Sequence, residues 1–150
     1  MEKDNKVQVL FICTGNSARS QMAEALLRSF GGDDFEVYSA GLEPKGLHPM
    51  AQKVMREIDI DISAYTSKHL DQFLHQSFDY IITVCDRAND NCPTFPGDNE
   101  RIHWSYEDPA AITNDSVAQQ QLFRQVRNEM SERLRIWVTV QRKRLTDSPR

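Results

Sequence analysis

The sequence has few cysteines, no long apolar run and no excess of basic residues. No apolar stretch approaches the ~20 residues of a membrane-spanning helix, which excludes a transmembrane protein of that kind. The formal charge of −4 argues against nucleic acid as a main partner, because nucleic-acid-binding domains carry a basic surface. Residues 1–6 are polar and lack the apolar core of a signal peptide. We therefore expect a cytoplasmic protein that does not bind a membrane.

Repeats, low-complexity segments and linkers between domains are also missing. A content of 39% hydrophobic and 27% charged residues is ordinary for a globular protein, so we expect residues 1–150 to form a single domain and, by default, a monomer. Three cysteines, an odd number, do not resemble a secreted disulfide framework. In a reducing compartment they are candidates for chemistry, although each can also be a small buried apolar residue.

Four short apolar runs, typical of buried strands, alternate with helical patterns. The runs cover residues 7–12, 35–40, 79–84 and 101–104, and the helical patterns cover 18–30, 50–58 and 116–145. Ser67 is expected to cap a short helix that ends near Leu74, and residues 85–97 have the composition of a loop. Apolar strands that alternate with helices indicate an α/β fold with a parallel sheet covered on both faces.

The segment Cys13-Thr-Gly-Asn-Ser-Ala-Arg-Ser20 lies between the first run and the first helical pattern. Gly15 allows a tight turn, and such a loop can surround an oxyanion with backbone N–H groups at the positive end of the next helix. The helix N-terminus and Arg19 favour the thiolate, so we expect Cys13 to ionise easily. The segment therefore predicts an anion-binding pocket with a nucleophile at its floor.

Each polar side chain of this loop has a candidate role. Arg19 can hold two oxygens of a tetrahedral anion in its planar fork. Ser20 can donate its hydroxyl to the Cys13 thiolate and lower the pKa of that group. Asn16 and Ser17 suit turn geometry, although a Ser17 that faces solvent is an equal alternative. The predicted substrate-binding residues are Thr14, Gly15, Asn16, Ser17, Ala18 and Arg19.

Three candidate groups follow three different strands. Cys13 follows the first run, Cys85 the third, and Asp108 the fourth. The carboxyl ends of parallel strands share one edge of the sheet, which is where ligands bind in such folds. An aspartate before a proline is most often a turn residue, but at this edge Asp108 can protonate a departing oxygen as a general acid.

Cys85 and Cys92 enclose six residues of a polar segment. They can be two unrelated thiols or half of a metal site. A zinc site needs more ligands at close spacing, and the histidines, at positions 48, 69, 75 and 103, are scattered. One thiol at a strand end and one in a polar segment suit a thiol–disulfide relay.

Together these motifs resemble arsenate reductases of the thioredoxin-coupled type, which share the fold of low-molecular-weight protein tyrosine phosphatases. The resemblance spans about residues 7–134 and rests on the Cys13–Glu24 segment, Tyr38-Ser-Ala-Gly41, Asp59-Ile-Asp-Ile-Ser63, Cys85 with Cys92-Pro93, and His103-Trp104 with Asp108-Pro109-Ala110. It implies three layers, with a four-stranded parallel sheet in the order 2-1-3-4.

The resemblance also implies a relay of three cysteines. Cys13 attacks arsenate held by the loop and Arg19, and Asp108 protonates the leaving oxygen. Cys85 then attacks Cys13, which releases arsenite, and Cys92 attacks Cys85. The resulting disulfide is reduced by an external dithiol protein, such as thioredoxin or one of the glutathione–glutaredoxin type, with no tightly bound cofactor. The physiological role implied is arsenic detoxification.

Two positions depart from the pattern of the family. Ala18 stands where several relatives carry an additional cysteine. In members that bind potassium, Asn16, Glu24, Ser39 and Thr66 correspond to residues around the ion, and an acidic residue follows the threonine by two places. Lys68 occupies that place here. We expect its ammonium group to replace the cation, although a solvent-facing Lys68 is an equal alternative.

Two other functions compete with arsenate reduction. A protein tyrosine phosphatase would use Cys13, Arg19 and Asp108 and would form a cysteinyl-phosphate intermediate. Such enzymes surround the pocket with aromatic residues, and here only Tyr106 is evident near Asp108. Weak phosphatase activity is expected in either case, because arsenate and phosphate are alike in shape and charge. A non-catalytic sensor of redox state or oxyanions would use the same thiols.

Overall fold

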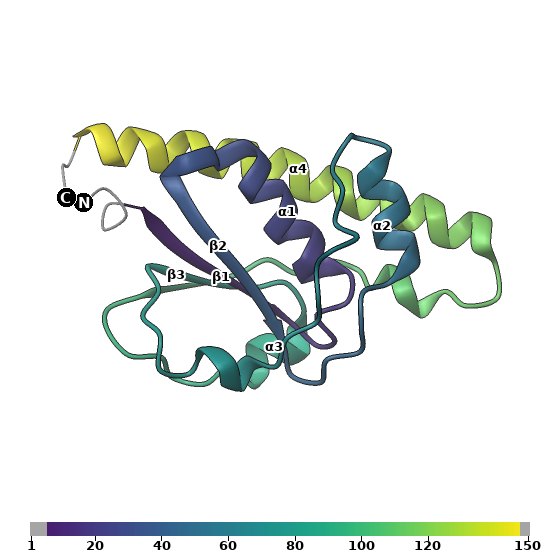
Figure 1. Ribbon diagram of the computed structural model, residues 1–150, viewed down its shortest axis with the longest axis horizontal. Coiled ribbons are helices and arrows are strands. Elements are labelled where there is room, and N and C mark those ends of the chain that lie inside the picture. The colour runs from purple at the N-terminus through teal and green to yellow at the C-terminus, as the bar shows by residue number, and fades with distance from the viewer. Residues whose placement is uncertain (1–5, 148–150) are drawn as a thin grey trace.

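A parallel sheet between two layers of helices organises the computed structural model, which describes residues 6–147 (Figure 1). The strands are β1 (Val7–Cys13), β2 (Phe35–Gly41), β3 (Tyr80–Thr83) and β4 (Glu100–His103). They lie in the order β2-β1-β3-β4, and all neighbouring pairs are parallel. The predicted fold class, strands and order are confirmed. The expected single domain and the polar N-terminus include residues that lie outside the described part of the chain.

Helices cover both faces of this sheet. They are α1 (Arg19–Gly31), α2 (Pro49–Arg56), α3 (Asp86–Asp90) and α4 (Ser116–Asp147), with short 3-10 turns at Gly32–Asp34, Leu70–Phe73 and Pro109–Ala111. Figure 1 shows α1 and α4 on one side of the sheet and α3 on the other. Side chains alternate along a strand, so Arg101 and His103 of β4 contact the segment around α3 while Ile102 faces α4.

The core lies where α1 and α4 pack on the central strands. Strand β1 is buried almost throughout, as expected for a strand with a neighbour on each side and helices above and below. The apolar stripe of α4 is buried as its periodicity predicts, at Phe123, Val126, Met130, Leu134 and Val138. This packing fixes where the strand ends lie, and therefore where the loops that follow them meet.

Two local predictions are wrong. Residues 86–90 form helix α3 instead of loop, because Ala88 is completely buried and Asp86 lies at the positive end of the helix. Ser67 does not cap the turn at Leu70–Phe73, which is capped by the side chain of His69. The Ser67 hydroxyl instead donates to the backbone carbonyl of Asn16 at 2.6 Å. This hydrogen bond stabilises the loop that follows Cys13.

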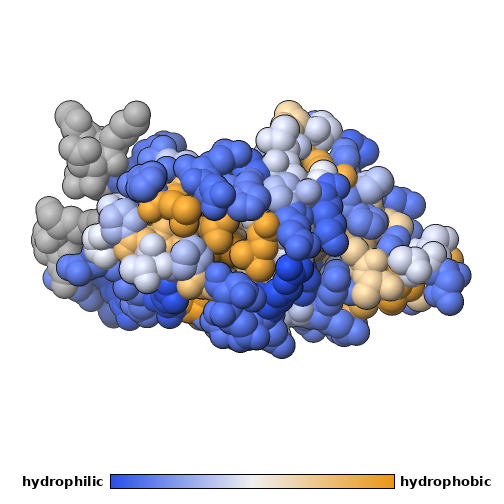
Figure 2. All heavy atoms as spheres, turned by 90° about the horizontal axis from the view of Figure 1, so that it is seen from below, coloured by the Kyte–Doolittle hydropathy of each residue, from blue (hydrophilic) through white to orange (hydrophobic). Residues whose placement is uncertain are grey.

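The described surface is mostly polar. Seen from the side of α3, hydrophilic residues surround a central area of apolar ones (Figure 2). Large apolar side chains that are exposed are Ile58, Val117, Ile136 and Val140, and the last three lie on α4. Within residues 6–147, no helix has both the length and the apolar character that crossing a bilayer requires.

Candidate active site

The loop after β1 folds tightly against the end of β2. Asn16 has a φ of 46°, in the left-handed region, which reverses the chain within the loop. Gly41 of β2 makes the close approach feasible, because a Cβ atom there would lie 2.7 Å from the Asn16 nitrogen and 2.8 Å from the Thr14 oxygen. Helix α1 begins at Arg19 with no side-chain cap. Its first N–H groups are therefore available to an anion.

A chain of buried hydrogen bonds runs beneath Cys13. The Ser20 hydroxyl lies 2.7 Å from the Cys13 sulfur and accepts a hydrogen bond from Asn16 Nδ2 at 2.8 Å. The same Asn16 group donates to Ser39, which donates to Glu24 at 2.6 Å. Because Asn16 already donates to the Ser20 oxygen, the Ser20 proton is free to point at the sulfur. This geometry suits the predicted role of Ser20.

Opposing effects set the pKa of the Cys13 thiol. Burial is the largest effect and raises the pKa above its ordinary value. Hydrogen bonds from Ser20 and Asn16 and the charge of Arg19 lower it, but by less. The expectation that Cys13 ionises easily is not met, because the cost of desolvating a thiolate exceeds the gain from these groups.

Arg19 and Asp108 lie together at the pocket. Arg19 Nη1 donates to the Tyr106 carbonyl at 3.0 Å, and its Nη2 is 3.7 Å from Asp108 Oδ2. The other oxygen of Asp108 accepts the N–H of Ala110, so the carboxyl group caps the turn that starts at Pro109. Asp108 is thus both the turn residue and a pocket residue, and the two interpretations do not exclude each other.

The remaining cysteines differ in their distance from the loop. Cys85 is buried at the N-terminus of α3, with its sulfur 3.3 Å from Thr14 Oγ1. Cys92 lies beyond the other end of α3, where Arg101 contacts its carbonyl and that of Pro93. Burial raises the pKa of the Cys92 thiol, against the opposing charge of Arg101. All three cysteines are free thiols.

A pocket of about 330 Å³ opens above the loop. Of the predicted site residues it contains Cys13, Thr14, Gly15, Ser17, Ala18, Arg19 and Asp108. Asn16 and Ser20 are completely buried and support the loop from below. Cys85 and Cys92 are not among the lining residues. The remaining lining residues are Lys45, Arg87 and Ala110.

Sequence reasoning missed Lys45 and Arg87. Lys45 reaches the pocket from the loop after β2, and its side chain packs within 3.4 Å of the place that a Gly15 Cβ would occupy. Arg87 reaches it from α3. The position of Arg87 two residues after Cys85 was the available signal. Because residues 85–97 were predicted to be a loop, the direction of the Arg87 side chain could not be predicted.

Comparison with known proteins identifies the family. The family of low molecular weight phosphotyrosine protein phosphatases matches residues 8–147. The chain belongs to this family. The arsenate reductase of Halalkalibacterium halodurans is 46% identical over 131 residues, which cover 87% of this chain and 94% of that protein.

Solved structures that resemble this chain include arsenate reductases. A structure described as an arsenate reductase in the phosphate binding state matches with a TM-score of 0.73 at 31% identity, over 89% of this chain and 97% of its own. The thioredoxin-dependent arsenate reductase of Corynebacterium glutamicum matches with a TM-score of 0.68 at 31% identity, over 92% and 63% of the two chains.

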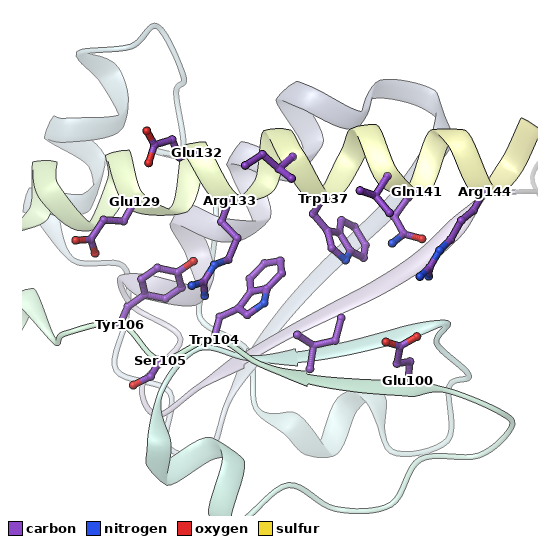
Figure 3. A pocket seen from close by; sticks show the side chains of 13 residues that line it. Glu100, Trp104, Ser105, Tyr106, Glu129, Glu132, Arg133, Trp137, Gln141 and Arg144 are labelled. Carbon is purple, nitrogen blue, oxygen red and sulfur yellow. The ribbon is translucent and has the colours of Figure 1, made fainter.

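A larger groove of this family member lies elsewhere. It measures about 730 Å³ and shares no lining residue with the pocket above Cys13. Figure 3 shows the side chains of Trp104, Arg133 and Trp137 between β4 and α4, with Tyr106 at one end. The Tyr106 ring thus belongs to this groove, and the described residues that line the anion pocket include no aromatic one.

Lys68 lies beside the hydrogen bonds that support the loop. Its Nζ donates to the Thr66 carbonyl at 2.7 Å, and its backbone N–H donates to Asn16 Oδ1 at 2.8 Å. Burial lowers the pKa of the ammonium group, while the charge of Glu24 acts in the opposite direction. Among residues 6–147, no group of three or more His, Cys, Asp and Glu residues is arranged to hold a metal ion.

The role of Ser20 can be measured from the pH dependence of Cys13 alkylation. We expect Ser20→Ala to raise the pKa of Cys13 further, because the thiolate loses a buried hydrogen bond. The alkylation profile with iodoacetamide should move to higher pH, and the rate near neutral pH should fall several-fold. All proteins compared carry Cys85→Ser and Cys92→Ser, so that Cys13 is the only thiol. Ser17→Ala is the matched control, and an unmoved profile in Ser20→Ala would refute the role.

Proposed function

We propose that this protein reduces arsenate to arsenite through its three cysteines. The observation that carries the proposal is the placement of the thiols: Cys13 at the floor of an anion pocket, Cys85 against the same loop, and Cys92 across a short helix. The names of the relatives that match nearly the whole chain support the choice of arsenate. Arsenic detoxification is the proposed physiological role.

The first step is attack by Cys13 on bound arsenate. Arg19 and the N–H groups of the loop hold the oxyanion, and the Cys13 sulfur bonds to arsenic. Asp108 gives a proton to the departing hydroxyl group, which leaves as water. Because burial raises the pKa of Cys13, the thiol is protonated before substrate binds, and an arsenate oxygen takes that proton. Arsenic remains pentavalent in the adduct.

The second step reduces arsenic. Cys85 attacks the Cys13 sulfur, a disulfide forms, and the sulfur–arsenic bond breaks with its electron pair moving to arsenic, which leaves as arsenite. Cys92 then attacks Cys85 and frees Cys13. Cys92 follows Cys85 by seven positions, with helix α3 between them, and seven steps of helical rise span roughly 10 Å. A disulfide needs Cα atoms within about 7 Å, so α3 must change its conformation in this step.

An external dithiol protein closes the cycle by reducing the Cys85–Cys92 disulfide. Thioredoxin is the proposed donor, since one matching structure is of a thioredoxin-dependent enzyme, and a donor of the glutaredoxin type is the alternative. No tightly bound cofactor is needed, because both electrons come from cysteine sulfurs. Such donors act in reducing compartments, which favours the cytoplasm. A monomer suffices, because all the groups named belong to one chain.

Phosphatase activity is the second candidate, favoured by the name of the family. Phosphate would form a cysteinyl intermediate at Cys13, which water would hydrolyse. The residues that line the pocket contribute cations and a carboxylate but no aromatic side chain to receive a phenyl ring. We therefore propose phosphatase activity as a weak side reaction on small phosphate esters.

The relay is tested by arsenate turnover with thioredoxin, thioredoxin reductase and NADPH. Cys85→Ser and Cys92→Ser should each reduce turnover to background, since either change breaks the electron path. Both should keep the wild-type rate of p-nitrophenyl phosphate hydrolysis, whereas Cys13→Ser should lose both reactions. Normal arsenate reduction by both variants would refute the relay. A wild type without turnover would favour a phosphatase or a sensor.

We also propose that turnover is independent of potassium. Arg28 already pairs with Glu24 at 2.6 Å, and the Lys68 ammonium group would add a second positive charge beside the loop. Turnover should be the same in potassium and sodium salts of equal ionic strength. Lys68→Asp, which restores an acidic residue, should make turnover potassium-dependent. Strong activation of the wild type by potassium over sodium would contradict the proposal.

A further inference from the structure

Arg87 brings a second guanidinium group to the anion pocket. It lies on α3, two positions after Cys85, and is one of the residues that line the pocket. Its Nη1 and Nη2 donate to the two carboxylate oxygens of Glu43 at 3.3 and 2.9 Å. Glu43 is in the loop after β2 and is not itself a lining residue. The ion pair thus joins the pocket rim to a carboxylate outside it.

The two arginines of the pocket are held in different ways. Arg19 is largely buried, with 13% of its side chain exposed, and is fixed by the Tyr106 carbonyl. Arg87 and Glu43 are 51% and 56% exposed. Exposed ion pairs are weak, because water screens the charges and the side chains lose little by separating. Arg87 can therefore exchange its carboxylate partner for an anion in the pocket at little cost.

Glu43 has two unfavourable effects on such an anion. It neutralises the charge of Arg87, and it adds a negative charge near the pocket. The Arg87 hydrogen bonds hold the pKa of Glu43 below its usual range, so the carboxylate is ionised at neutral pH. Lys45 also lines the pocket, and its charge also lowers the pKa of Glu43. The Glu43 carboxylate therefore partly neutralises the charge of Lys45 as well.

We propose that Arg87 is a further oxyanion-binding residue of this pocket and that Glu43 limits its contribution by holding it in an ion pair. The inference rests on the proposed function only in taking the pocket as the oxyanion site. Because Arg87 belongs to α3, the bound anion also contacts the helix that separates Cys85 from Cys92. Because Arg87 attracts the anion and Glu43 opposes this attraction, removing Arg87 should weaken anion binding and removing Glu43 should strengthen it.

The test is the affinity of the reduced protein for inorganic phosphate, measured by titration calorimetry. Arg87→Gln should weaken binding roughly threefold to tenfold, in keeping with the modest strength of exposed charge pairs. Glu43→Gln should strengthen binding about twofold or more, because Arg87 is released and a repulsive charge is lost. The double variant should bind no more tightly than the wild type, because no Arg87 is released, and at least as tightly as Arg87→Gln, because the repulsive charge of Glu43 is lost. Arg87→Lys should keep most of the wild-type affinity.

Matched controls separate local from overall charge effects. Arg56→Gln and Glu132→Gln change the same unit charges on exposed positions of α2 and α4 outside the pocket, and should leave the affinity unchanged. An ion pair that merely stabilises α3 would make Arg87→Gln and Glu43→Gln act in the same direction. That result, or an Arg87→Gln variant equal to Arg56→Gln, would overturn the inference.

Arg19→Gln distinguishes this inference from the proposed function. Loss of phosphate binding in Arg19→Gln, combined with an unaffected Arg87→Gln, overturns only the role of Arg87. Phosphate binding that Arg19→Gln leaves intact means that the pocket is not the oxyanion site, and the proposed function fails with it. Thermal unfolding of each variant verifies that the compared proteins are folded.

Discussion

The site depends on the buried side chain of Asn16. Its amide group donates to Ser20 and Ser39, and its oxygen accepts the backbone N–H of Lys68. These bonds tie the loop to α1, to β2 and to the segment before Leu70, while the left-handed φ of Asn16 reverses the chain. Buried hydrogen-bond networks of this kind make the structure around them rigid. It holds Cys13 at the pocket floor and leaves the Ser20 proton for the sulfur.

Much of this arrangement could be predicted because it follows from strand ends. The apolar runs predicted the strands, and parallel topology then brought the Cys13 loop, Cys85 and Asp108 to one edge. Helix α3 could not be predicted, because its Asn and Asp residues are poor helix formers and its stability comes from burial of Ala88. The direction of Arg87 depended on that helix. The raised pKa of Cys13 depended on the extent of burial, which the sequence does not reveal.

The proposed chemistry divides between two parts of the fold. In the proposed mechanism the pocket binds and activates a tetrahedral anion, a capacity that suits phosphate as well as arsenate and agrees with the family name. The second and third thiols lie at the two ends of α3, outside the pocket lining. In this account the pocket selects the anion and α3 determines whether electrons are transferred. The Arg87–Glu43 pair lies where these two parts meet.

The most direct test of this account is disulfide mapping after a single turnover without reductant. Fully reduced protein is mixed with excess arsenate, quenched by alkylation and analysed by mass spectrometry of its peptides. The three-cysteine relay predicts one arsenite released per chain and a disulfide between Cys85 and Cys92, with Cys13 alkylated. Arsenite formed without that disulfide, or oxidation confined to Cys13, would contradict it.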